Sequence, residues 1–185
     1  MIREYLEQNV YEALQERLAF LFAEFDNIYV SFSGGKDSGL LLELVMEYQR
    51  THCPEKRVGL FHQDFEAQYT VTTEYVERTF ERLKDETEPY WVCLPMATRT
   101  ALSSYQMYWY PWDDQKKEAW VRPMPEKEYV ICLENNPIAT YHYRMHRRTS
   151  QSSSGAGTGS RTERNGRCAC LGCARTNRSS DTADL

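Results

Sequence analysis

The chain has 185 residues, 41% hydrophobic and 26% charged, which is the size and composition of one globular domain with its own core. No apolar run approaches the roughly 18 residues of a membrane span, and the N-terminus lacks the basic-then-apolar form of a signal peptide, so we expect a cytoplasmic protein that does not contact membranes. Residues 147–185 hold seven Arg and three acidic residues, a net +4, which leaves −9 for residues 1–146 and argues against direct binding of nucleic acid.

Strands and helices are expected to alternate along the first half of the chain. Apolar residues at helical spacing predict a helix over 3–23, and IYVSF at 28–32 predicts a buried strand. A leucine-rich helix should follow, then a strand at 57–62, a helix within 64–86 and a strand at 90–96. This order implies right-handed βαβ units, and therefore an α/β fold with a mostly parallel sheet and helices on both faces.

The second half of the chain divides into an insert, one short strand or lid edge, and a tail. Residues 101–127 are aromatic, charged and interrupted by proline, which predicts an ordered insert over the edge of the sheet. We expect one domain over residues 1–145 that includes this insert. Residues 146–185 contain almost no large apolar side chain, so we expect a disordered tail.

The sequence SGGKDS, from Ser33 to Ser38, lies between the first predicted strand and the helix that follows it. Unpaired backbone N–H groups and the positive end of a helix dipole meet at such a turn, which makes it an anion site. The adjacent glycines Gly34 and Gly35 allow positive φ values and a close approach of the backbone to a bound phosphate. The turn is not a Walker A loop, because that loop has four residues between its glycines. The serines supply hydroxyl groups and Lys36 a cation.

A purely structural role for this turn is the alternative, in which the glycines make a tight turn and Asp37 or Ser38 caps the helix. The acids after the second strand, Asp64 and Glu66, are likewise either ligand-binding or helix-capping residues. We expect a structural role for His62 and core packing or lid formation for the aromatic residues at 105–120, with base stacking as the alternative. Basic side chains of the insert could reach phosphates but are expected to form a solvated charge run: Lys116, Lys117 and Arg122.

The SGGKDS turn resembles the signature of the PP-loop, or adenine nucleotide α-hydrolase-like, superfamily, which includes ATP pyrophosphatases and phosphoadenosine phosphosulfate (PAPS) reductases. The resemblance extends through LFHQDFEAQYTVTTEYVE, YWVCLPM and YWYPWDDQKKEAWVRPMP to PAPS reductase family proteins, including the immunoglobulin-binding-regulator type, and covers about residues 1–145.

The resemblance implies a domain that binds an adenine nucleotide, either ATP or PAPS. The phosphates, or the sulfate of a sulfonucleotide, would be held by the whole turn: Ser33, Gly34, Gly35, Lys36, Asp37 and Ser38. Lys36 and Asp37 would be the catalytic residues, and Asp64 would lie near the ribose and adenine. Where ATP is cleaved between its α and β phosphates, Mg²⁺ held with help from Asp37 would neutralise the pyrophosphate leaving group.

The tail contains three closely spaced cysteines, Cys168, Cys170 and Cys173. At this spacing their thiolates could bind one metal ion or iron–sulfur cluster together. No fourth ligand is evident, and the Glu-Cys-Gly-Leu-His segment of PAPS reductases does not occur, so we expect no cluster in this chain and disfavour sulfonucleotide reduction. With permissible codons, a displaced reading frame of the tail spells a string that resembles the family motif G-x-R-x-x-E-S. We therefore expect a frame change near residues 145–151 and a truncated domain, which sequencing the coding DNA would test.

Three functions are compatible with these features. The first is a PP-loop enzyme that cleaves ATP and adenylates an acceptor, or acts on a sulfonucleotide. The second is a nucleotide-sensing regulatory or partner-binding protein that keeps the phosphate-binding turn but catalyses no reaction, and the third is a non-functional truncated product.

Overall fold

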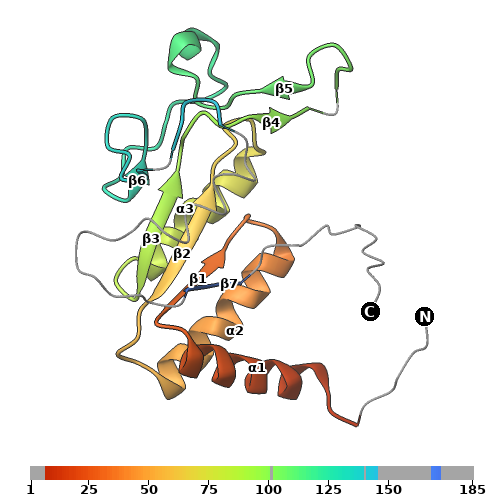
Figure 1. Cartoon of the computed structure of the whole chain (residues 1–185), viewed down its shortest axis with the longest axis vertical. Coiled ribbons are helices and arrows are strands. Elements are labelled where there is room, and N and C mark those ends of the chain that lie inside the picture. The colour runs from red at the N-terminus through yellow and green to blue at the C-terminus, as the bar shows by residue number, and fades with distance from the viewer. Residues whose placement is uncertain (1–6, 101, 140, 146–167, 172–185) are drawn as a thin grey trace, which may run out of the picture.

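The structure is a computed structural model that describes residues 7–100, 102–139, 141–145 and 168–171. Helices and strands alternate along the chain (Figure 1), in the order α1 (Val10–Glu24), β1 (Asn27–Ser31), α2 (Lys36–His52), β2 (Val58–Gln63), α3 (Thr70–Leu83), β3 (Thr87–Val92), β4 (Thr98–Arg99), β5 (Tyr108–Trp109), the 3₁₀ helix η1 (Asp114–Ala119), β6 (Val130–Ile131) and β7 (Cys168–Leu171). In the part of the chain that is described, no helix is long and apolar enough to cross a membrane.

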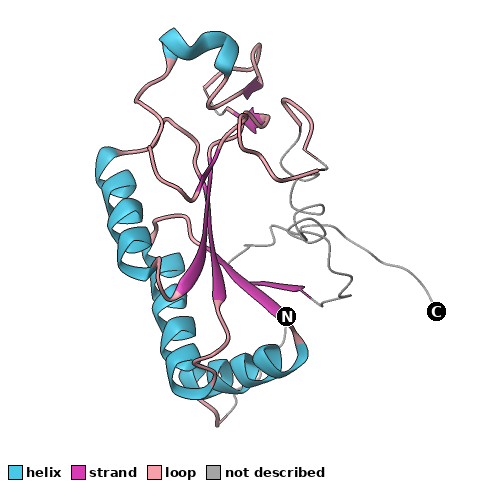
Figure 2. Cartoon of the chain, turned by 90° about the vertical axis from the view of Figure 1, so that its left-hand side faces the viewer, coloured by secondary structure: helices cyan, strands magenta, loops and turns pink. Residues whose placement is uncertain are grey.

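The predicted α/β fold with a parallel sheet is confirmed. Five parallel strands form the sheet in the order β6-β3-β2-β1-β7, and β4 and β5 form a separate antiparallel pair. The chain steps from β1 to β2 to β3 in one direction, and right-handed crossovers that step in one direction place their helices on one face. Figure 2 shows α2 and α3 on the same side of the sheet accordingly.

The core lies between these helices and the sheet. Alternate residues of β1, Ile28 and Val30, are buried against α2 and α3 together with Phe32, Leu60 and Phe80. The predicted helices on both faces are not found among the described residues. A second cluster contains Val92, Leu94 and Met96, and partly buried residues between 131 and 141 pack against it. Connecting segments after β6, rather than a helix, supply that packing.

Helix α1 begins later than its apolar spacing predicts. Asn9 is the N-cap: its side chain accepts from the Glu12 N–H at 2.9 Å, and the Glu12 carboxylate accepts from the Asn9 N–H at 3.1 Å. This reciprocal capping box satisfies N–H groups that would otherwise lack partners, and so fixes the first turn at Val10. Residues 3–6 of the predicted helix lie outside the described residues.

Strand β7 corrects the prediction of disorder for one part of the tail. Cys168–Leu171 pairs in parallel with β1, with Cys168 beside Asn27 and Leu171 beside Val30. Without this strand, β1 would present an unpaired row of N–H and C=O groups, and Cys-Ala-Cys-Leu is the most apolar stretch of the tail. The rest of the predicted tail within 146–185 is not among the described residues.

The position of β7 also creates a reversal of strand order next to β1. After β1 the chain moves outward through β2, β3 and β6, and it returns to the other side of β1 with β7. Ligands of open parallel sheets bind beyond the carboxyl ends of the strands at such a reversal. The turn at 33–38 follows the carboxyl end of β1 and lies at this position.

Candidate functional site

Hydroxyl hydrogen bonds fix the backbone of the SGGKDS turn. The Ser33 and Ser38 hydroxyl oxygens are 3.0 Å apart, and the Ser38 hydroxyl donates to the Gly35 carbonyl at 3.0 Å. The Ser33 N–H donates to the Ser38 hydroxyl oxygen at 3.3 Å. The two serines therefore tie the start of the turn to the first turn of α2.

The start of α2 has no side-chain cap. Gly35 is the N-cap, and the alternative in which Asp37 or Ser38 caps the helix does not occur, since the Ser38 hydroxyl donates to a carbonyl. The first N–H groups of a helix have no partner within the helix, and the helix dipole is positive there. This end of α2 therefore suits an anion, and the side chains of Lys36 and Asp37 are exposed beside it.

The turn lies directly on the first half of α3. Gly34 has a φ of +80°, and a Cβ added there would be 2.8 Å from the Cγ2 atoms of both Thr72 and Val76. In α2, a Cβ on Gly39 would be 2.8 Å from the Tyr75 hydroxyl. Close packing as well as φ thus favours glycine at Gly34, whereas at Gly39 the contact is with the end of a side chain that can move. These α3 contacts have no signal in the sequence, because helix periodicity does not reveal which loop a helix face meets.

A magnesium ion would find one carboxylate at the turn, that of Asp37. Mg²⁺ is commonly held by one or two carboxylates together with substrate phosphates and waters, so this donor set fits Mg²⁺ that arrives with a nucleotide. No group of three or more His, Cys, Asp or Glu side chains arranged for a metal occurs among the described residues. Of the tail cysteines, Cys168 and Cys170 lie in β7, and Cys173 lies outside the described residues.

Asp64 lies at the same edge of the sheet as the turn, as expected, but its carboxylate is fully buried and engaged by protein groups. It accepts from Arg122 Nη2 at 2.6 Å on both oxygens, from Trp91 Nε1 at 2.8 Å and from the Glu66 N–H at 2.7 Å. The buried thiol of Cys93 lies 3.8 Å away. The role of Asp64 near ribose and adenine stays a prediction.

Glu66 holds the insert against the β2–α3 loop. Its carboxylate accepts from the backbone N–H groups of Trp112 and Val121, both at 2.8 Å, and its carbonyl accepts from Arg122 Nε at 3.0 Å. The Trp112 indole donates to the Asp64 carbonyl at 3.1 Å, and the Arg122 guanidinium lies 4.9 Å from the centre of its ring. We call Asp64, Glu66, Trp112, Val121 and Arg122 the insert clamp.

The insert clamp decides several predictions. Trp112 is buried and packs edge-on against Trp120 with ring centres 5.2 Å apart, which confirms core packing for this part of the insert, whereas Tyr105 is fully exposed. Lys116 and Lys117 are exposed, as a solvated charge run requires. The prediction is wrong for Arg122, whose side chain is 19% exposed and pairs with the buried Asp64. Neither Asp64 nor Glu66 caps α3. The N-cap of this helix is Tyr69, which makes no capping hydrogen bond with its side chain.

His62 is buried in the core beneath the turn, which confirms its predicted structural role. Its Nδ1 lies 2.7 Å from the Phe32 carbonyl oxygen, and its ring packs edge-on against Trp91 at 5.2 Å. Burial lowers the pKa of His62, and this outweighs the Phe32 hydrogen bond and the nearby Asp64 charge, which raise it. The imidazole is therefore neutral in the folded protein near pH 7.

This pKa shift predicts a pH dependence of stability. Below about pH 6.5 the unfolded chain binds a proton at His62 that the folded protein does not, so stability present above that pH is lost as the pH falls. We expect the free energy of unfolding of the wild type, measured with urea, to fall between about pH 6.5 and pH 5. The slope should be smaller in His62→Asn, and an unchanged slope would contradict this assignment.

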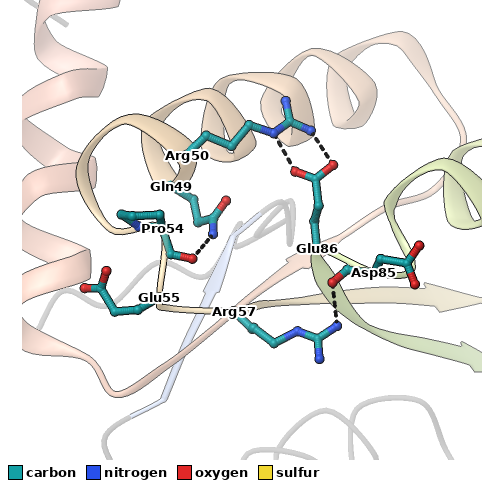
Figure 3. A pocket seen from close by; sticks show the side chains of 7 residues that line it. All are labelled: Gln49, Arg50, Pro54, Glu55, Arg57, Asp85 and Glu86. Carbon is teal, nitrogen blue, oxygen red and sulfur yellow. Dashed lines mark hydrogen bonds and ion pairs between the residues drawn. The ribbon is translucent and has the colours of Figure 1, made fainter.

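A hollow lies at the amino ends of β2 and β3, and most of the contacts in it are between groups of the protein itself. It is lined by residues from the end of α2 and from the segments before β2 and β3: Gln49, Arg50, Pro54, Glu55, Arg57, Asp85 and Glu86 (Figure 3). Arg50 pairs with both carboxylate oxygens of Glu86, and Arg57 donates to the carbonyls of Asp85 and Thr87. Because both arginines of this hollow are paired within the protein, we assign no ligand to it.

The fold and the turn together define a parallel α/β protein with an uncapped, glycine-rich helix start where the strand order reverses. No family model matches the chain, and no solved structure matches it. The chain is 40% identical over 119 residues to the Escherichia coli (strain K12) protein named Uncharacterized protein YbdN. The matched stretch is 64% of this chain and 28% of that relative, so the chain spans less than a third of the length of YbdN.

Proposed function

We propose that this chain binds an adenine nucleotide, ATP or PAPS, through the Ser33–Ser38 turn, as a PP-loop protein of the PAPS reductase family. The observation that carries the proposal is the start of α2, which lies at the strand-order reversal with no capping side chain and with Gly34 at positive φ. A phosphate or sulfate group would accept hydrogen bonds from the backbone N–H groups there. The reaction class is cleavage of ATP between its α and β phosphates with adenylation of an acceptor, or sulfonucleotide chemistry.

The residues of the turn have distinct roles in this proposal. Lys36 supplies a mobile cation to the anion, and Asp37 helps to hold Mg²⁺ that accompanies ATP. Bound Mg²⁺ would supply charge neutralisation of the pyrophosphate leaving group. Ser33 and Ser38 hold the backbone in the geometry that the anion meets, since each bonds within the turn.

Removal of the Lys36 cation should weaken nucleotide binding. We expect Lys36→Ala to raise the Kd for ATP or PAPS by about tenfold or more, because a charge-assisted hydrogen bond contributes roughly 1.5–3 kcal/mol. Isothermal titration of each nucleotide, ATP with Mg²⁺, measures this change and the preference between the two.

Lys84→Ala is the matched control, because it removes the same charge at the far end of α3, where Lys84 makes an exposed ion pair with Glu81. Its Kd should equal that of the wild type. No binding of either nucleotide by the wild type, or equal losses in both variants, would refute binding at the turn.

A second candidate is nucleotide sensing without chemistry. It is favoured by the full engagement of the Asp64 carboxylate in the insert clamp, which leaves no oxygen of that side chain exposed. An assay for AMP and pyrophosphate after incubation with ATP and Mg²⁺ separates the two candidates. Binding without formation of AMP would favour the sensor and remove the ATP-cleaving enzyme.

A further inference from the structure

The Phe32 carbonyl needs a donor that no backbone group of β2 supplies. The Phe32 N–H donates to the Phe61 carbonyl at 2.8 Å, which continues the pairing of β1 with β2. Because Ser31 lies opposite Phe61, the N–H in register with the Phe32 carbonyl is that of Gln63, and no backbone hydrogen bond joins these two groups among the described residues. The imidazole of His62 fills the gap, with Nδ1 at 2.7 Å from the Phe32 oxygen.

The tautomer of His62 follows from this contact. A carbonyl oxygen only accepts hydrogen bonds, so Nδ1 carries the proton and donates it. The other ring nitrogen is buried beside the Gln68 side chain of the β2–α3 loop. Ring contacts with Trp91 and Phe80 hold the imidazole plane, so the direction of the Nδ1–H bond is set by the core.

The hydrogen bond to Phe32 is the first link of a chain that reaches the helix start. The Phe32 carbonyl and the Ser33 N–H belong to one planar peptide unit, so fixing the carbonyl also fixes that N–H. The Ser33 N–H donates to the Ser38 hydroxyl oxygen, and this hydroxyl donates to the carbonyl of Gly35, the N-cap of α2.

We propose that His62 is a positioning residue of the turn: its Nδ1–H holds the Phe32–Ser33 peptide and, through Ser38 and Gly35, sets the backbone amides at the start of α2. The part of this role that concerns a ligand rests on the proposed function. The part that concerns the geometry of the turn stands without it, because every link is a contact within the protein.

Two variants, His62→Asn and His62→Gln, test whether the hydrogen bond to the Phe32 carbonyl matters, or only the packing of the side chain. In His62→Asn the amide nitrogen occupies the place of Nδ1 and can donate to Phe32, whereas in His62→Gln the amide lies one bond further out. We expect hydrogen exchange of the amides at 34–38 to become about fivefold faster in His62→Gln and to stay within about twofold of the wild type in His62→Asn. Exchange of the β3 amides is the control for global stability.

Nucleotide titration of the same variants links the turn to binding. The Kd for ATP or PAPS should rise about fivefold in His62→Gln and stay near the wild-type value in His62→Asn. Equal exchange at 34–38 in both variants and the wild type would overturn the positioning role. If the wild type binds neither nucleotide, the proposed function falls, while hydrogen exchange still decides the role of His62.

A measurement on the unmodified chain covers the case in which both variants unfold. Long-range ¹⁵N–¹H NMR of histidine-labelled wild type should show His62 as the neutral Nδ1–H tautomer, with a slowly exchanging Nδ1 proton. The Nε2–H tautomer would overturn the proposal, because Nδ1 could not then donate to the Phe32 carbonyl.

Discussion

Replacement of Arg122 by alanine should lower the free energy of unfolding by about 3–5 kcal/mol, because it leaves the buried carboxylate of Asp64 without its counter-charge. Arg122 Nη2 lies 2.6 Å from both Asp64 oxygens, and the two side chains are 19% and 0% exposed. The substitution also removes the guanidinium from the Trp112 ring and from the Glu66 carbonyl. Urea unfolding followed by tryptophan fluorescence would measure the loss.

Arg50→Ala is the matched control for this prediction. Arg50 makes a two-point ion pair with Glu86, but both side chains are more than two-fifths exposed, and exposed pairs contribute only about 0–1 kcal/mol. Equal losses in Arg122→Ala and Arg50→Ala would show that burial of Asp64 is not what makes the insert clamp important. A small loss in both variants would contradict the clamp as a source of stability.

Gly34→Ala should destabilise the protein by about 2–4 kcal/mol and abolish nucleotide binding. The residue has a φ of +80°, and its new methyl group would lie 2.8 Å from the Cγ2 atoms of Thr72 and Val76 in α3. The turn must therefore move away from α3, and the amides that would receive the anion move with it. Thermal unfolding and nucleotide titration of the folded variant would measure both effects.

Gly35→Ala distinguishes this strain from the loss of a glycine alone. Gly35 has a φ of −85°, and a Cβ there would meet only the Ser33 hydroxyl oxygen, at 3.4 Å. Its stability should stay within about 1 kcal/mol of the wild type. If Gly34→Ala is as stable as Gly35→Ala, the described packing of the turn on α3 is incorrect.

The alternation of strands and helices was predictable because local patterns determine it. Apolar spacing located α2 and α3, and β-branched and aromatic residues located β1 and β2 to within a few residues. Apolar spacing does not locate the start of α1, because it extends beyond the capping box that fixes the first turn. Pairing of β7 with β1 depends on an open sheet edge, which composition of the tail alone cannot reveal.

The candidate site was predictable only in part. The SGGKDS turn combines a strand end and a helix start within one local motif, so the sequence revealed its geometry. Arg122 and Asp64 are 58 residues apart, and their pairing depends on where the insert returns to the β2–α3 loop. The spacing Asp-x-Glu after β2 was the available signal for the insert clamp, but it equally describes a helix cap.

Backbone ¹H–¹⁵N NMR spectra recorded during titration with ATP and Mg²⁺, and separately with PAPS, test the central claim most directly. The amides of the Ser33–Ser38 turn should show the largest shifts, and these should saturate at the Kd found by calorimetry. Shifts confined to other elements, such as the hollow near Arg50 and Glu86, or no shifts with either nucleotide, would contradict an adenine-nucleotide site at the start of α2.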